Sequence, residues 1–187
     1  MIVLISMLRG INVGGHNIIK MDALRELFAS LKFGNPQTYV QSGNVVFQSA
    51  EHDPEKVAGR IKRGIEKKFG CRPEIIVRSA DELRSVIKKN PFARRSGIEP
   101  AKLLVSFLQT KPGKAAREEL IKQKFGPEEI HVFEQELYIY FPNGMGQSKL
   151  PWSRLDKILG TAGTGRNWNS VNKMLVMAET QEAALPR

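Results

Sequence analysis

"TYVQSGNVVFQS", residues 38–49, consists of two runs rich in β-forming side chains with Ser42, Gly43 and Asn44 between them. Glycine and asparagine adopt the positive φ angles of tight turns more readily than other residues. The stretch therefore predicts a β-hairpin. This hairpin decides the fold because of the elements that the sequence predicts on either side of it.

The segments before the hairpin predict a strand and then a helix. Residues 2–8 are almost wholly apolar, which is typical of a strand buried on both faces. Residues 21–32 place five apolar side chains on one helical face, and Gly34 follows as a stop signal. The chain thus reaches the hairpin in the order β-α.

After the hairpin the same two kinds of element follow in the order α-β. Asp53 and Pro54 are typical of a helix start, and Gly70 follows the predicted helix end at Phe69. Residues 73–79 predict a further strand. The order β-α-β-β-α-β is the ferredoxin-like pattern, and we assign it to an N-terminal lobe of residues 1–79.

Residues 80–187 predict a second α+β lobe, which we expect to pack against the first. Ser79 and Glu82 form a capping box at the start of its first helix. The predicted strands lie at 102–109, 129–134 and 137–141, and the predicted helices at 113–124, 151–159 and 167–179. The order β-α-β-β-α, followed by a C-terminal helix, resembles the first lobe, with the glycine-rich segment from Gly160 to Arg166 as a connecting loop.

The composition favours an anionic partner. The chain of 187 residues has 29 basic and 19 acidic side chains, a net charge of +10, which attracts nucleic acids, nucleotides and phosphorylated metabolites. No apolar run approaches the roughly 18 residues of a membrane span. A single cysteine, Cys71, excludes an internal disulfide. The N-terminus lacks the basic region of a signal peptide, so we expect a cytoplasmic protein.

The predicted topology places two loops at one end of the first sheet. The first two strands of a ferredoxin-like sheet are parallel, so the hairpin turn lies near the loop Arg9–Asn17. Both segments carry glycine and asparagine, whose positive φ angles can expose backbone N–H groups as an anion-binding nest beside Arg9. Each turn taken alone is also explained by its backbone geometry.

Two stretches of the second half have a similar composition: "FPNGMGQSKL", residues 141–150, and "GTAGTGRNWNS", residues 160–170. In the latter we expect Trp168 to be a core residue and Asn167 a helix cap, whereas no structural role is evident for Arg166. The predicted ligand-binding residues are donors and turn glycines from all four stretches: Arg9, Asn12, Gly14, Gly15, Ser42, Gly43, Asn44, Ser148, Lys149, Arg166 and Asn167.

The segments "MLRGINVGGHNIIKMDALRELFASLKF", "TYVQSGNVVF", "FPNGMGQSKL" and "GRNWNSVNKML" resemble, in this order, the bacterial family known as domain of unknown function 1697. The resemblance extends from residue 4 to about residue 178. It implies an α+β fold with a ferredoxin-like N-terminal part, and it implies no function. Gly165 and Ser170 depart from the usual family pattern around the arginine.

The sequence predicts no catalytic set and no metal or cofactor site. His16, His52 and His131 are scattered, and the glycine motif lacks the spacing of a Walker loop or a dinucleotide fingerprint. We expect the four loops with glycine, asparagine and arginine to converge on a site that binds an anionic ligand, either a nucleotide or a nucleic acid. Two alternatives stay open: an enzyme acting on a phosphorylated small molecule, and a scaffold protein without a ligand site. The oligomeric state is not predicted.

Overall fold

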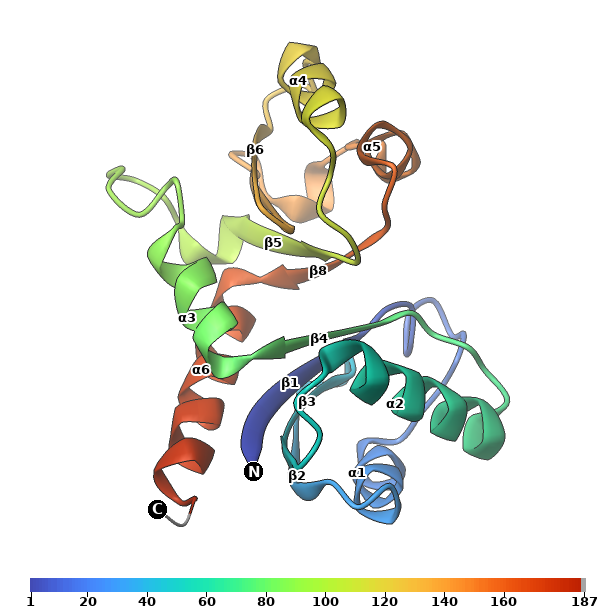
Figure 1. Cartoon of the computed structure of the whole chain (residues 1–187). Helices are drawn as coiled ribbons and strands as arrows, with labels where there is room; N and C mark the ends of the chain where they lie inside the picture. The colour runs from blue at the N-terminus through green and yellow to red at the C-terminus, as the bar shows by residue number, and fades with distance from the viewer. Residues whose placement is uncertain (186–187) are drawn as a thin grey trace. The chain divides into compact units, whose positions relative to one another are not determined.

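The structure, a computed structural model, describes residues 1–185 (Figure 1). The chain forms two compact units, which are described separately. The first unit contains residues 1–85 together with the chain from residue 172 onward, and the second contains residues 86–171. The first division falls inside helix α3 (Ala80–Lys88), a few residues beyond the boundary predicted at residue 80.

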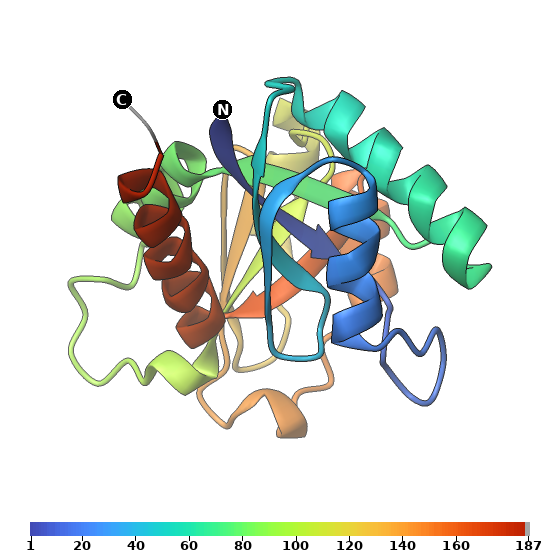
Figure 2. The same cartoon turned by 90° about the horizontal axis from the view of Figure 1, so that it is seen from below.

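Four strands and two helices of the first unit match the six predicted elements. They are β1 (Ile2–Leu8), α1 (Met21–Ser30), β2 (Gly34–Tyr39), β3 (Asn44–Ser49), α2 (Pro54–Phe69) and β4 (Ile75–Ser79). The strands form one sheet in the order β2-β3-β1-β4, and all neighbours are antiparallel. Helix α1 lies alongside the β2–β3 hairpin (Figure 2).

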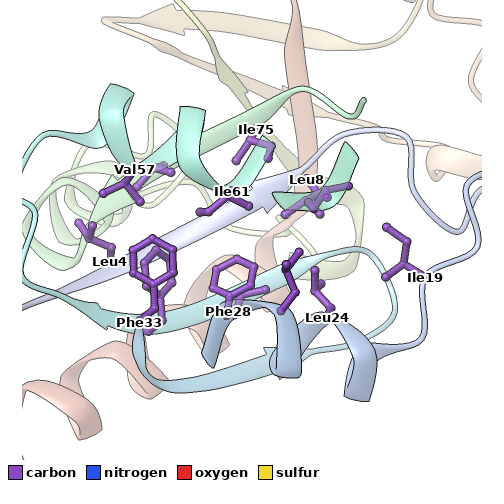
Figure 3. Packing of buried hydrophobic residues seen from close by; sticks show 14 of the residues in the cluster. Leu4, Leu8, Ile19, Leu24, Phe28, Phe33, Val57, Ile61 and Ile75 are labelled. Atoms are coloured by element: carbon purple, nitrogen blue, oxygen red, sulfur yellow. The ribbon is translucent and has the colours of Figure 1, made fainter. Parts of the chain in front are cut away.

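The core of the first unit lies between this sheet and helices α1 and α2, whose apolar side chains gather in one cluster (Figure 3). Phe28 of α1 meets Phe47 of β3 edge to face, with ring centroids 5.1 Å apart. Ile61 of α2 and Leu4 of β1 are fully buried in the same cluster. Each such burial stabilises the unit by about 1.5–3 kcal/mol.

The second unit repeats the topology of the first. Its elements are β5 (Leu103–Leu108), α4 (Lys114–Lys122), β6 (Glu129–Phe133), β7 (Glu136–Tyr140), α5 (Trp152–Leu159) and β8 (Gly163–Asn167), with short 3-10 turns η1 (Pro100–Lys102) and η2 (Met145–Gln147). The sheet order is β6-β7-β5-β8, again antiparallel throughout. Helices α4 and α5 cover one face of it (Figure 1). The fold is thus mixed α+β with two four-stranded antiparallel sheets.

Strand β8 differs from the prediction, which made this segment a loop. A Cβ atom on Gly163 would lie 2.4 Å from Ser106 Oγ, and one on Gly165 would lie 3.1 Å from Leu104 Cδ1. Side chains of β5 therefore occupy the space that β8 residues would normally fill. Glycine gives no β-propensity signal, but it allows this close approach between strands.

Helix α6 (Trp168–Ala183) is the last helix in the part of the chain that the structure describes. Its buried stripe consists of Val171, Met174, Ala178 and Gln181, whereas Trp168, which we expected in the core, is only half-buried. In the first unit, Gln181 Nε2 donates hydrogen bonds to the carbonyl oxygens of Asn35 (2.9 Å) and Val46 (3.3 Å). The amide of Gln181 thereby ties α6 to the β2–β3 hairpin.

Candidate functional site

The loop after β1 and the β2–β3 turn lie side by side in the first unit, as the sequence predicts. Asn12 connects them: its Nδ2 donates to the carbonyl oxygens of Gln41 (2.8 Å) and Ile19 (3.0 Å), and its Oδ1 accepts from Ile19 N (2.8 Å). The backbone N–H of Leu8 donates to Gly43 O at 3.0 Å. These bonds fix the turn against the loop.

Most of the predicted ligand donors in this region serve the fold. The Asn12 amide is used by the bonds above, and Asn44 is buried with its Nδ2 donating to Tyr39 O and Ser42 Oγ. A Cβ on Gly43 would lie 2.7 Å from Ile11 Cδ1, so glycine is required for close packing.

Arg9, Gly14 and Gly15 are the other predicted residues of this loop. Arg9 is half-buried, and its backbone N–H donates to Glu74 O at 2.8 Å. Gly14 and Gly15 are exposed, with φ angles of +58° and +79°. Because L side chains rarely adopt these angles, the two glycines form the turn that brings the chain back toward α1.

Arg166, predicted as a ligand-binding residue, is a buried residue of β8. Its side chain is held by bonds from Nη1 to Thr164 Oγ1 (2.8 Å) and Gly165 O (2.9 Å). Burial lowers the pKa of its guanidinium to about 10, because desolvation disfavours the charged form. Asn167 caps the next helix as predicted, with Oδ1 accepting from Asn169 N at 2.9 Å. Both residues therefore have structural roles.

Arg78 occupies the position of Arg166 in the first unit. Arg78 lies opposite Ile5 of β1, and Arg166 lies opposite Val105 of β5. Both arginines are 6% exposed, and Arg78 Nη1 donates to Val77 O at 3.0 Å. The sequence analysis did not identify Arg78. The one sequence feature that could have identified it is a charged residue near the end of an otherwise apolar strand.

A hollow of about 500 Å³ in the second unit contains the last predicted residue, Lys149. We call it the basic hollow, because Lys124, Lys149 and Arg154 line it. Its only lining carboxylate, Glu128, accepts a hydrogen bond from Ser148 Oγ (2.5 Å). Ser148 Oγ also accepts from Leu150 N (3.1 Å), so Ser148 positions Glu128 and the chain beside it.

The cations of the basic hollow lack carboxylate partners. Within residues 1–185, neither Lys124 nor Lys149 forms an ion pair, and the Arg154 guanidinium donates to the neutral amide oxygen of Gln123. Pro151 precedes the first turn of α5, and it also lines the basic hollow. The positive end of a helix therefore adds to the local field. Sequence reasoning found Lys149 but missed Lys124 and Arg154, which look like ordinary helix-end cations in sequence.

The predicted residues fall into two groups, one in each unit. In the first unit, the loop after β1 and the start of β3 lie at the end of β1 marked by Leu8. In the second unit, β7 and β8 finish opposite Leu103 and Leu104, at the beginning of β5. Within its own unit, the first group thus lies at the end of the central strand β1, and the second group lies at the beginning of the central strand β5.

Other features that could indicate a function are metal-binding clusters, reactive histidine and cysteine side chains, and membrane-spanning helices. No group of three or more histidine, cysteine or acidic side chains suited to a metal ion occurs among the described residues. The exposed ring of His131 packs against Phe92, with centroids 5.2 Å apart, and Cys71 is a half-buried thiol. In the part of the chain that the structure describes, no helix is both long enough and apolar enough to span a membrane.

Comparison with solved structures supports the fold. One solved structure, that of the conserved bacterial protein SP0830 from Streptococcus pneumoniae, is similar over 95% of this chain and 98% of its own, with a TM-score of 0.71 and 17% identity. At this identity the likeness shows the fold alone. Among curated proteins, none matches the chain.

The family comparison covers most of the chain. Residues 1–138 match the family described as "Protein of unknown function (DUF1697)". The first two of the four segments that carry the resemblance lie inside this range, and the segments beginning at Phe141 and Gly165 lie beyond it. The chain belongs to the DUF1697 family of proteins of unknown function.

Proposed function

We propose that this protein binds a small anionic ligand and that the basic hollow of the second unit is the site. The observation that carries the proposal is the gathering of Lys124, Lys149 and Arg154 around a single hollow of about 500 Å³. Small-molecule sites typically have volumes of about 300–1,000 Å³. Hydrogen bonds from ammonium and guanidinium groups to phosphate oxygens are among the strongest in proteins.

The surrounding charge supports the same proposal. Residues 86–171 contain 14 basic and 8 acidic side chains. A basic field of this kind raises the local concentration of anions. Glu128 is the one carboxylate in the lining, and the Ser148 hydroxyl donates to it. An entering phosphate therefore meets three cations and one carboxylate whose charge is already partly satisfied.

A nucleotide-sized ligand fits these observations better than a nucleic acid does. A polymer needs a track of cations that follows its backbone. Lys56, Arg60, Arg63 and Lys67 of α2 recur at helical spacing but offer little of such a track. Arg60 donates to Leu31 O and lies over the Phe33 ring at 4.7 Å, and Lys56 lies 3.9 Å from Asp53. Arg63 and Lys67 are the exposed cations that remain on that face.

We also propose that both units belong to the ferredoxin-like class. The support is the order β-α-β-β-α-β in each unit, together with the strand orders β2-β3-β1-β4 and β6-β7-β5-β8.

The scaffold alternative is favoured for the loop of the first unit by one observation. Asn12, Gly43 and Asn44 are all used in holding the loop and the turn together. On this interpretation the loop Arg9–Asn17 has a structural role, and the ligand site lies in the second unit.

A charge-removal experiment tests the proposal. We compare K124A/K149A/R154A with K56A/R63A/K67A, which removes the same number of positive charges from α2. Binding of inorganic phosphate and AMP is measured by isothermal titration calorimetry. Each lost charge-assisted bond is worth about 1.5–3 kcal/mol, so the first variant should bind at least about tenfold more weakly, while the α2 variant should bind as the intact chain does.

The same experiment can overturn the proposal. Equal losses in the two variants would mean that net charge alone attracts the anion. Absence of phosphate and AMP binding to the intact chain would remove the site altogether. A fluorescence-anisotropy titration with single-stranded RNA at two salt concentrations completes the test: RNA binding that is much tighter than AMP binding and is lost in the α2 variant would identify a polymer site on α2 instead.

A further inference from the structure

A second hollow adjoins the basic hollow in the second unit. It has a volume of about 440 Å³, and its lining is mixed. Leu120, Ile121, Phe125 and Ile130 are apolar, whereas Gln123, Lys124, Glu128 and His131 are polar or charged. We call it the apolar hollow after its four aliphatic and aromatic side chains. Four residues line both hollows: Lys124, Phe125, Gly126 and Glu128. The two spaces therefore meet at the segment that connects α4 to β6.

The apolar hollow arises from a difference in helix packing between the units. In the first unit, α1 packs on the edge strand β2 and buries Leu24, Leu27 and Phe28. In the second unit, α4 packs mainly against α5 and buries only Leu120. With fewer apolar side chains to fill the corner beside the edge strand β6, the second unit retains an open space there.

The wall of the apolar hollow leaves large apolar side chains uncovered. Ile121 is 79% exposed on the last turn of α4, and Phe125 and Ile130 are half-buried. Lys124 extends the positive charge of the basic hollow to the boundary between the two spaces. A ligand that satisfies both surfaces has an anionic group at one end and a flat apolar group at the other.

We propose that the ligand is a phosphorylated molecule with a planar aromatic ring, of the mononucleotide class, with its phosphate in the basic hollow and its ring in the apolar hollow. This inference rests on the proposed function. The ring lies against the Phe125 side chain and covers Ile121 and Ile130. Because Lys124, Phe125, Gly126 and Glu128 line both hollows, one small molecule can contact the cations of the first and the apolar side chains of the second.

The test compares two ligands that differ only in the ring. AMP and ribose 5-phosphate share the phosphate and the sugar, and isothermal titration calorimetry measures both. Stacking of a base on an aromatic side chain changes affinity by about tenfold. We expect the intact chain to bind AMP about tenfold more tightly than ribose 5-phosphate. I121S, whose residue lines the apolar hollow but not the basic hollow, should remove most of this preference while leaving ribose 5-phosphate binding unchanged. F125L should also lower the preference for AMP.

A matched variant and a fold check make the test specific. V176S replaces another aliphatic residue that is 54% exposed on a helix, outside both hollows, and should keep the preference for AMP. Thermal unfolding followed by circular dichroism verifies that each variant is folded. Because Ile121 is so exposed, I121S leaves the core intact and serves as the test if F125L does not fold.

The outcomes separate this inference from the proposed function. Equal binding of AMP and ribose 5-phosphate by the intact chain would overturn the inference and leave the anion site standing. Retention of the AMP preference in both F125L and I121S would also overturn it, because the ring would lie elsewhere. Absence of binding of either ligand and of inorganic phosphate would overturn both proposals.

Discussion

The two units share a topology and a register but fill their cores differently. Residues 4–8 pair with β4 as residues 104–108 pair with β8, and a serine stands at the centre of each run. Arg78 and Arg166 occupy matching places. Phenylalanine rings gather in the core of the first unit, whereas in the second unit two hollows meet at the segment between α4 and β6. The same backbone plan is thus filled in two different ways.

The largest change in the free energy of unfolding should come from the loss of a phenylalanine ring in the core of the first unit. Phe28→Ala removes a fully buried side chain that contacts Phe33 and Phe47. Phenylalanine-to-alanine changes in cores cost about 3–5 kcal/mol. Leu120→Ala, the matched change on α4, should lie at the lower end of its 2–5 kcal/mol range, because it borders a space that is already open. Urea unfolding of both variants measures the difference. A Leu120 variant as unstable as the Phe28 variant would mean that the second core is equally closed.

The next effect concerns the glycines that distinguish β8 from β4. Where β4 has Ile75, β8 has Gly163, and each faces a leucine at the end of the central strand. Gly163→Ala places its Cβ against Ser106 Oγ and 3.0 Å from Phe107 O. Overpacking of this kind costs about 1–3 kcal/mol. Adding Ser106→Ala should recover part of the loss, and thermal unfolding of the single and double variants measures how much. An unchanged melting temperature in Gly163→Ala would contradict the close approach of β5 and β8.

The glycines of β8 also show why some elements could be predicted from the sequence and others could not. Residues 2–8 form a continuous apolar run, and residues 54–69 lie between clear helix start and stop signals; both elements appear as predicted. Strand β8 carries no such signal, because its requirement for small residues comes from β5, a neighbour that is distant in sequence. The contact between the loop after β1 and the β2–β3 turn could be predicted from the predicted topology. The basic hollow could not be predicted, because Lys124 and Arg154 come together only through the packing of α4 on α5.

A smaller difference lies in the helix caps. Asp53 caps α2, its carboxylate accepting from Glu55 N at 2.9 Å, whereas Gly113 precedes α4 without a side-chain cap. Asp53→Ala should cost about 1 kcal/mol, and Gly113→Asp should stabilise the chain by a few tenths of a kcal/mol to about 1 kcal/mol. Chemical denaturation of the two variants compares the units directly. Destabilisation by Gly113→Asp would show that the geometry before α4 does not suit a cap.

The smallest effect tests the serine at the centre of the first repeat. Ser6 is fully buried, and within residues 1–185 its hydroxyl has no hydrogen-bond partner. A buried donor without a partner costs the free energy of its desolvation, so Ser6→Ala should be neutral or stabilise the chain by up to about 1 kcal/mol. The midpoint of urea unfolding measures this change. A loss of more than about 1 kcal/mol would mean that the hydroxyl has a partner in solution. It would also make the matching serine of the second unit, Ser106, the place to look for the same bond.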